Sequence, residues 1–314
     1  MSTSYAIVLY AYNQQDYVRE AARSVLAQTC RPTDILFTDD CSTDGTFDIL
    51  REEAERYDGP HRIRLNRNKV NLGVIEHVHR VFQLCDADMM INCAGDDLSH
   101  PDRARRIMEL CEREAPLLVF SEAKVETLDG APAPPRYRSA TFYHRRDAGS
   151  AATSMQLYLG ATCAWHKDLV RRFGPVTEDV VFEDLVYGFR AALEGRVGYI
   201  DEALVTYRVG AGVTNTARQA EKLDAVKTRR ATEIGREAAV LRQRLKDAQT
   251  FGLAPKDRLC RRLTIALRQR ETRTAFIEGD RTALRGAIRR HPIETSVICL
   301  SEARKWRRQA CRNA

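Results

Sequence analysis

The sequence predicts an α/β fold, in which a mostly parallel sheet is flanked by helices and followed by an all-helical, basic C-terminal extension. From Tyr5 to Leu65, short apolar runs alternate with amphipathic helical patterns, and this order is typical of a parallel sheet with right-handed crossovers. Two of the apolar runs end in adjacent carboxylates. Beyond Ala217 only helical patterns remain, broken near Phe251–Pro255, Glu278–Asp280 and His291–Pro292.

The first half of the predicted sheet follows from these apolar runs. Tyr5–Tyr10 is nearly all apolar, as expected of a parallel strand that is covered on both faces. Asp16 then opens a helix, to about Gln28, that has one apolar face. The next strand, helix and strand are predicted at Asp34–Thr38, from Asp44 or Thr46 to Tyr57, and at Arg62–Leu65.

The second half begins with a helix at Val74–Cys85, followed by the apolar run Met89–Asp97. His100-Pro101 begins a helix to about Arg113, since proline suits the first helical turn. The remaining strands and helices are predicted at Leu117–Phe120, with Ala123–Leu128 as an edge extension, Gly160–His166, Lys167–Phe173, Phe182–Leu193, Arg196–Ile200 and Ala203–Arg208.

Acidic residues end two strands of this sheet. Asp39 and Asp40 follow one strand, and Asp96 and Asp97 follow another. Ligands of open α/β sheets bind outside the carboxyl ends of the strands, so these side chains stand where a substrate is expected. Carboxylates held close together repel unless a cation offsets their charge, and Mg²⁺ or Mn²⁺ bound to a phosphorylated ligand suits this role. The alternative is structural, since Asp40 and Asp44 also suit the start of a helix.

Charge divides the chain into two parts. Residues 217–314 contain 25 Lys and Arg against 11 Asp and Glu, a net charge of +14, whereas residues 1–216 have a net charge of −7. We therefore expect a catalytic domain at 1–216 and a helical region at 217–314 that meets an anionic surface, either membrane phospholipid or a charged polymer. A solvated helical bundle or a homo-oligomer contact explains the same charges. We expect no nucleic-acid partner.

No segment approaches the roughly 20 apolar residues of a membrane span. The first residues lack a basic region followed by a long apolar one, so we expect a cytoplasmic protein, at most peripheral to the plasma membrane. The nine cysteines form no C-x-x-C pair, which is typical of reduced thiols rather than a zinc site.

Two polar loops are candidates for ligand contacts. Asn66–Gly73, with Arg67 and Lys69, leads into a helix and suits a nucleotide, although surface loops often have such a composition. Asp129–Gly149 suits a lid that closes over phosphates, or else an insertion without a ligand. Its proline-rich start is followed by five basic residues: Arg136, Arg138, His144, Arg145 and Arg146.

An ordered set of motifs across residues 4–215 resembles the family 2 glycosyltransferases of the GT-A fold. The set consists of Tyr12-Asn13, Ser24–Thr29, Asp39–Thr46, Asn71-Leu72-Gly73, Gly95-Asp96-Asp97, Glu183-Asp184 and Tyr207-Arg208. The resemblance implies an inverting transferase that moves a sugar from a nucleoside-diphosphate donor, here a UDP-sugar, to an acceptor hydroxyl with Mn²⁺ or Mg²⁺. It also implies a saccharide or lipid-linked acceptor in the synthesis of bacterial lipopolysaccharide, capsule or exopolysaccharide.

The resemblance assigns roles to individual residues. Asp40 corresponds to the aspartate that binds the nucleotide base, and the pair Asp96-Asp97 to the metal element, with Asp97 on the metal and Asp96 on the ribose. Asp184, or else Glu183, corresponds to the general base that takes the proton of the acceptor hydroxyl. The other implied donor contacts are Tyr10, Tyr12, Asn13, Asn71, Gly73 and Arg208.

The chain also departs from the family. Many relatives have a histidine shortly after the Tyr-Arg pair, whereas Val209–Gly212 follows here, so that loop lacks the side chain that would contact a metal or phosphate. Cys41 stands where small or polar residues are frequent.

Three other functions are suggested by parts of the sequence. An EF-hand-like calcium loop at Asp40–Gly45 lacks its bidentate glutamate, because Arg51 occupies the twelfth position. A sugar nucleotidyltransferase needs a glycine-rich phosphate loop, which Ala11–Gln15 does not provide. A non-catalytic carbohydrate-binding or scaffold protein that kept the sheet is the third alternative.

Overall fold

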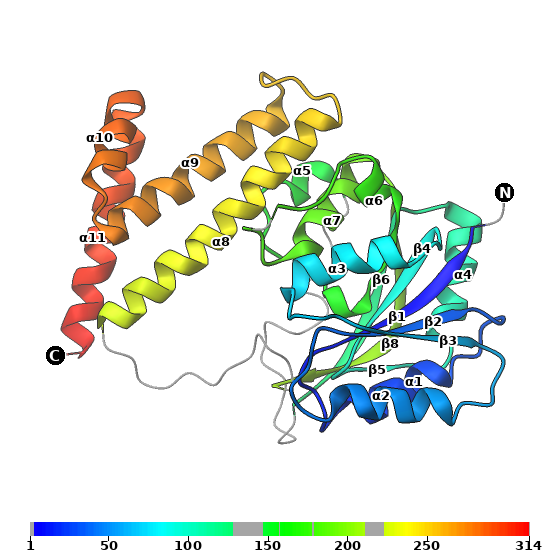
Figure 1. Cartoon of the computed structure of the whole chain (residues 1–314). Helices are drawn as coiled ribbons and strands as arrows, with labels where there is room; N and C mark the ends of the chain where they lie inside the picture. The colour runs from blue at the N-terminus through cyan, green and yellow to red at the C-terminus, as the bar shows by residue number, and fades with distance from the viewer. Residues whose placement is uncertain (1–2, 128–146, 157, 178, 211–222, 314) are drawn as a thin grey trace. The chain divides into compact units, whose positions relative to one another are not determined.

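The computed structural model describes residues 3–127, 147–156, 158–177, 179–210 and 223–313 (Figure 1). The predicted basic loop lies almost wholly outside these residues. The chain forms two compact units. The first comprises Met1–Ala151, Gln156–Glu178 and Phe182–Ala217, and the second comprises Ala152–Met155, Asp179–Val181 and Arg218–Ala314. The predicted boundary at residue 216 did not include the two short segments of the second unit. The assignment of the first unit as catalytic, and of the second as a region that meets an anionic surface, stays a prediction.

The first unit contains an eight-stranded sheet with strand order β3-β2-β1-β4-β7-β6-β8-β5, within the described residues. Strands β3, β2, β1 and β4 are parallel, as predicted, whereas β7 runs antiparallel to both β4 and β6. The strands are β1 (Tyr5–Ala11), β2 (Asp34–Asp39), β3 (Arg62–Arg67), β4 (Met89–Ala94), β5 (Leu98–Ser99), β6 (Leu118–Thr127), β7 (Ala164–His166) and β8 (Val197–Val209).

Three predicted strands have different bounds in the structure. The two predicted pieces at residues 196–208 form the single strand β8, which pairs in parallel with β6 through an irregular register near Ser121 and Glu122. The predicted extension at residues 123–128 is likewise continuous with β6 as far as Thr127, and residue 128 lies outside the described residues. Residues 160–166 are divided into a 3-10 turn, η3 (Gly160–Thr162), and the short strand β7. The α/β class with flanking and C-terminal helices is confirmed.

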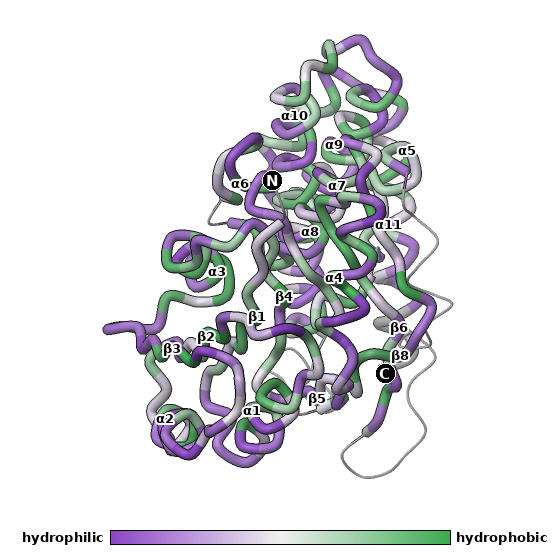
Figure 2. The backbone as a smooth tube through the Cα atoms, turned by 90° about the vertical axis from the view of Figure 1, so that its right-hand side faces the viewer, coloured by the Kyte–Doolittle hydropathy of each residue, from purple (hydrophilic) through white to green (hydrophobic). Residues whose placement is uncertain are grey.

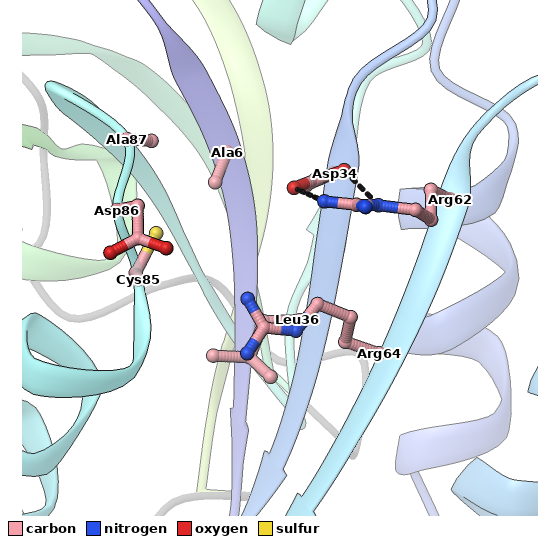
Figure 3. Close-up of a pocket in the computed structure, with 8 residues that line it drawn as sticks. All are labelled: Ala6, Asp34, Leu36, Arg62, Arg64, Cys85, Asp86 and Ala87. Atoms are coloured by element: carbon pink, nitrogen blue, oxygen red, sulfur yellow. Dashed lines mark hydrogen bonds and ion pairs between the residues drawn. The ribbon is translucent and has the colours of Figure 1, made fainter.

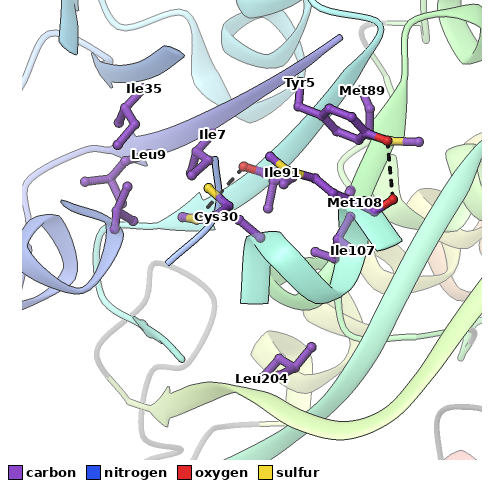
Figure 4. Packing of buried hydrophobic residues seen from close by; sticks show 14 of the residues in the cluster. Tyr5, Ile7, Leu9, Cys30, Ile35, Met89, Ile91, Ile107, Met108 and Leu204 are labelled. Atoms are coloured by element: carbon purple, nitrogen blue, oxygen red, sulfur yellow. Dashed lines mark hydrogen bonds between the residues drawn. The ribbon is translucent and has the colours of Figure 1, made fainter. Parts of the chain in front are cut away.

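Alternate residues of the central strands pack against helices on opposite faces of the sheet, and Figure 4 shows the larger of the two clusters, with Ile7, Leu9 and Ile107. Ile7 and Leu9 belong to a large core that includes residues of α1, α2 and α4, whereas Val8 packs with Val81 of α3. Figure 2 shows hydrophobic and hydrophilic stretches alternating along these helices. The helices of the first unit are α1 (Val18–Leu26), α2 (Thr46–Glu55), α3 (Gly73–Leu84), α4 (Arg103–Glu114), α5 (Ala148–Ala151), α6 (Asp168–Arg171) and α7 (Glu183–Leu193).

The second unit is helical, with a break at each predicted position. Its helices are α8 (Leu223–Thr250), α9 (Arg258–Glu278), α10 (Arg281–Arg290) and α11 (Pro292–Asn313). Asp280 caps α10 by accepting the backbone N–H groups of Thr282 and Ala283 at 3.0 and 2.9 Å. Among the described residues, no helix has the length and apolar character needed to cross a membrane.

Candidate active site at the carboxyl edge of the sheet

The two acidic strand ends flank the end of the same central strand. Strand β1 lies between β2 and β4, so the chain leaves all three strands at one edge. The backbone N–H of Asp40 donates to the carbonyl of Ala11 at 3.0 Å, and the N–H of Gly95 donates to the carbonyl of Tyr10 at 2.8 Å. The predicted base-binding and metal-binding segments are thus neighbours across β1.

Asp40 organises the loop between β3 and α3. Its carboxylate is buried and accepts three hydrogen bonds, from the Asn68 side-chain amide at 2.8 Å and from the backbone N–H groups of Leu72 and Gly73 at 2.9 Å each. Gly73 has φ +74°, which favours glycine, and its N–H is also shared with the Asn71 side chain at 2.8 Å. The predicted contacts Asn71 and Gly73 therefore surround Asp40.

Asn13 connects the loop after β1 to the loop after β2. It has φ +49°, a conformation that asparagine tolerates better than most residues. Its backbone N–H donates to the Ser42 hydroxyl at 2.9 Å, and its side-chain oxygen accepts the N–H of Thr43 at 2.8 Å. The buried Asp39 carboxylate accepts both the N–H and the hydroxyl of Ser42. Tyr12 lies in the same turn and donates its N–H to the Gln14 side chain.

Tyr10 belongs to a polar network at the end of β1. Its hydroxyl donates to the Asn92 side-chain oxygen at 3.3 Å, and its ring meets His77 edge-on at 5.4 Å. His77 in turn lies 2.7 Å from the Thr38 hydroxyl. Burial raises the pKa of Tyr10 well above its usual value and lowers the pKa of His77, so both groups are neutral near pH 7.

The Gly95-Asp96-Asp97 turn leaves little room beside β1. A Cβ at Gly95 would lie 2.5 Å from Gln14 Oε1 and 3.1 Å from the Tyr10 carbonyl oxygen. Burial, followed by repulsion from Asp96, raises the pKa of Asp97 to about 8, and burial also raises the pKa of Asp96. Asp97 Oδ1 accepts a backbone N–H, whereas the buried Oδ2 has no hydrogen-bond partner in the described part of the chain.

Arg208 closes the other side of this turn. Its backbone N–H donates to Asp97 Oδ1 at 2.9 Å, which joins the end of β8 to the acidic turn. The guanidinium group is paired with the Glu20 carboxylate of α1. This ion pair uses Nη2 of Arg208, and the phosphate contact by Arg208 stays a prediction.

Arg103, at the start of α4, is fully buried below the acidic turn. Its guanidinium donates to the carbonyl oxygens of Asn92 at 2.7 Å and Ala161 at 3.0 Å, and to the Ser99 hydroxyl at 3.1 Å. These bonds hold the end of β4 beside η3. No local pattern in the sequence indicates this role, because an arginine in a first helical turn is ordinarily exposed.

Glu183 and Asp184 lie in the first turn of α7, next to η3. Asp184 Oδ1 accepts the N–H of Leu185 at 2.8 Å, and its backbone carbonyl accepts the hydroxyl of Tyr158. Asp184 Oδ2 would lie 3.4 Å from a Cβ at Gly160, so the carboxylate packs against the η3 backbone. Burial, followed by repulsion from Asp184, raises the pKa of Glu183 to about 8.

Sequence reasoning missed three residues that shape this edge: Gln14, Arg103 and Tyr158. Gln14 follows the predicted donor contacts Tyr12 and Asn13 in the loop after β1, and its side chain contacts the acidic turn. Tyr158 contacts Asp184 from a segment with no periodic pattern.

A separate hollow lies at the opposite end of the strands (Figure 3). Asp34 and Arg62 begin β2 and β3, and the Arg62 Nε donates to Asp34 at 2.7 Å. The remaining lining residues are Ala6, Leu36, Arg64, Cys85, Asp86 and Ala87. This hollow is remote from the carboxyl edge, so it is not part of the candidate site.

Residues 6–174 match the family described as Glycosyl transferase family 2, which is more than half of the chain. The protein therefore belongs to the family 2 glycosyltransferases. A relative in Mycobacterium tuberculosis, the uncharacterized protein Rv1520, is 28% identical over 213 residues, which cover 65% of this chain. The chain spans 58% of the length of that relative.

Solved structures share the fold at low sequence identity. TarS of S. aureus, residues 1–349 in complex with UDP-GlcNAc, has a TM-score of 0.58 at 13% identity and covers 99% of this chain and 92% of its own. The mannosyltransferase PcManGT from Pyrobaculum calidifontis, in complex with GDP-Man and Mn²⁺, has a TM-score of 0.57 at 16% identity, with coverages of 98% and 83%. The GT-A prediction is consistent with both structures.

Proposed function

We propose that the protein is an inverting glycosyltransferase that moves a sugar from a nucleoside-diphosphate donor, a UDP-sugar, to an acceptor hydroxyl. The observation that carries this proposal is the placement of Asp40 and Asp97 on either side of the end of β1. The similar structures that contain UDP-GlcNAc and GDP-Man support a nucleotide-sugar donor. In this proposal Asp40 and its loop hold the base, Asp96 the ribose, and Tyr10, Tyr12 and Asn13 line the same edge.

The donor set of the acidic turn fits a divalent metal. Asp97 Oδ2 is buried without a partner, and the raised pKa of Asp97 indicates that its negative charge lacks compensation. No group of three or more His, Cys, Asp or Glu in the described ranges is arranged to hold an ion. Such a turn suits Mg²⁺ or Mn²⁺, which take one or two carboxylates and fill their other positions with phosphate oxygens and water. The ion would stabilise the charge of the leaving diphosphate.

Asp184 is the proposed general base. A carboxylate there would take the proton of the acceptor hydroxyl as the hydroxyl attacks the anomeric carbon opposite the departing diphosphate, so the configuration inverts. Asp184 Oδ1 accepts the Leu185 N–H at 2.8 Å, whereas burial, followed by repulsion from Asp184, raises the pKa of Glu183 to about 8. This difference supports Asp184 over Glu183.

The proposed setting is bacterial surface-polysaccharide synthesis, with a saccharide or lipid-linked acceptor. The excess of Lys and Arg in residues 217–314 supports a peripheral position at the cytoplasmic face of an anionic membrane. The second proposed role of residues 217–314 is a contact between copies of the chain in a homo-oligomer.

Calorimetric titration with UDP-sugars and Mn²⁺, followed by an assay for UDP release with acceptor extracts, tests the function. We expect metal-dependent binding and release of UDP. Binding without release would favour a scaffold that kept the sheet, and no binding of any nucleotide-sugar would contradict the proposal.

A further inference from the structure

Helix α11 exposes an apolar stripe. Ile293, Val297 and Leu300 are 82%, 60% and 59% exposed, which are large values for side chains of this kind. Their spacing of four and three residues places them on one face of the helix. We call these three residues the α11 stripe.

The opposite face of α11 packs against the other helices of the second unit. Thr295, Ile298, Glu302 and Trp306 are buried, and α11 contacts α9. The α11 stripe therefore does not contribute to the core of the second unit. Exposed apolar side chains in such a group lower the solubility of a protein unless a partner or a membrane covers them.

Basic residues extend the face of the α11 stripe. Arg304, Arg307 and Arg308 follow Leu300 at the spacing of the same helical face and are exposed. The neighbouring helix α10 has no buried residue. It exposes Arg281, Arg285, Ile288 and Arg289.

Acidic groups do not offset this charge. Helices α10 and α11 contain two carboxylates in their described side chains, Glu294 and Glu302. The Glu294 carboxylate accepts a hydrogen bond from Arg268 Nε at 2.8 Å, and Glu302 is buried. The exposed carboxylates Glu278 and Asp280 precede α10 and are not on α11. A second copy of α11 would therefore bring no exposed carboxylate of its own to Arg304, Arg307 and Arg308, whereas a bilayer that contains anionic lipid offers both phosphate groups and apolar chains.

We propose that the α11 stripe inserts into the headgroup region of an anionic membrane, with α11 lying in the plane of the surface and Arg304, Arg307 and Arg308 on lipid phosphates. Apolar residues and basic residues that share one exposed helical face can contact acyl chains and lipid phosphates at the same time, as in helices that lie on membranes rather than span them. This inference rests on the proposed function, in which a lipid-linked acceptor lies at the membrane. Binding of the protein to vesicles can nevertheless be measured without any transfer reaction.

The test is flotation of the full chain with phosphatidylcholine vesicles that contain or lack phosphatidylglycerol. We expect binding only with phosphatidylglycerol, and weaker binding at high salt. Val297→Glu combined with Leu300→Glu should lower the partition coefficient at least about tenfold, because charges replace the inserting groups. Phe251→Glu is the matched control, since Phe251 is 40% exposed at the turn between α8 and α9 and should bind as the wild type does.

Replacing Arg304, Arg307 and Arg308 together by Gln should weaken binding by roughly fivefold per arginine and flatten its salt dependence. Wild-type protein that fails to float, or a Val297→Glu, Leu300→Glu variant that floats equally well, would overturn the inference. So would a concentration-dependent dimer, seen by analytical ultracentrifugation, that the same variant abolishes. Circular dichroism of every variant reports folding. Vesicle binding by folded protein that binds no donor in calorimetry would count against the proposed function alone.

Discussion

Asp97 accepts the backbone N–H of Arg208 through one carboxylate oxygen, at 2.9 Å, while its other oxygen is buried without a partner in the described residues. The first contact fixes the direction of the carboxylate. The second oxygen is left for a ligand, and the adjacent Asp96 makes a cation the favourable one.

Asp97→Asn should therefore weaken donor binding at least about tenfold in the presence of Mn²⁺, because an amide oxygen lacks the charge that holds the ion. Calorimetry with and without Mn²⁺ measures the change. Asp102→Asn, on the exposed start of α4, is the control and should bind as the wild type does. Unchanged Mn²⁺-dependent binding by Asp97→Asn would exclude Asp97 as a metal ligand.

Asp184→Asn should leave donor binding near the wild-type value and lower turnover on the order of a hundredfold or more, since the variant loses the proposed general base. UDP release at saturating donor and acceptor is the measurement. Glu183→Gln serves as the comparison, and it should keep most of the activity. If Asp184→Asn transferred sugar at the normal rate, this role would be wrong.

The carboxyl group of Glu183 predicts a pH dependence of stability. Burial and the adjacent Asp184 raise its pKa to about 8, against about 4.3 in an unfolded chain. The folded protein thus retains a proton that the unfolded chain releases, so the free energy of unfolding decreases as pH rises from about 4 to about 8. Between about pH 5 and pH 8, the melting temperature of Glu183→Gln should therefore fall by roughly 5 °C less than that of the wild type.

Gly95→Ala should destabilise the protein by about 1–3 kcal/mol, because the new methyl group would meet the Gln14 side chain and the Tyr10 carbonyl. Urea unfolding measures this loss. Gly235→Ala is the contrasting variant, since Gly235 lies within α8 with open space around it. That variant should gain up to about 1 kcal/mol from helix propensity. Equal effects at the two positions would contradict the steric explanation.

Arg103→Met should cost about 2–3 kcal/mol, because the carbonyl groups of Asn92 and Ala161 would lose a charged donor inside the protein. Arg105→Met, on the exposed side of the same helix, should cost about 1 kcal/mol or less. A chemical denaturation series on both variants makes the comparison. A loss at Arg103 no larger than that at Arg105 would show that these bonds contribute little.

The fold was predictable where hydrophobic periodicity is strong. The parallel strands β1, β2 and β4 are apolar runs covered on both faces, and the breaks between α8, α9, α10 and α11 carry glycine or proline. The antiparallel strand β7 was not recognised as such, because pairing direction depends on distant contacts rather than on local pattern.

In the candidate site, only the residues at the ends of parallel strands could be placed from the sequence. The chain order of β1, β2 and β4 brings Asp40 and the Asp96-Asp97 pair to one edge, which follows from parallel topology. The ion pair of Arg208 with Glu20 and the burial of Arg103 arise from tertiary packing, for which the sequence contains no local pattern.

The three hydrogen bonds that Asp40 receives from the loop between β3 and α3 have a kinetic consequence. Because these bonds to Asp40 order the loop within the folded protein, its loss of chain entropy occurs during folding and not when a ligand arrives. Association at this part of the edge should then follow a single concentration-dependent phase, without a slower isomerisation of residues 68–73.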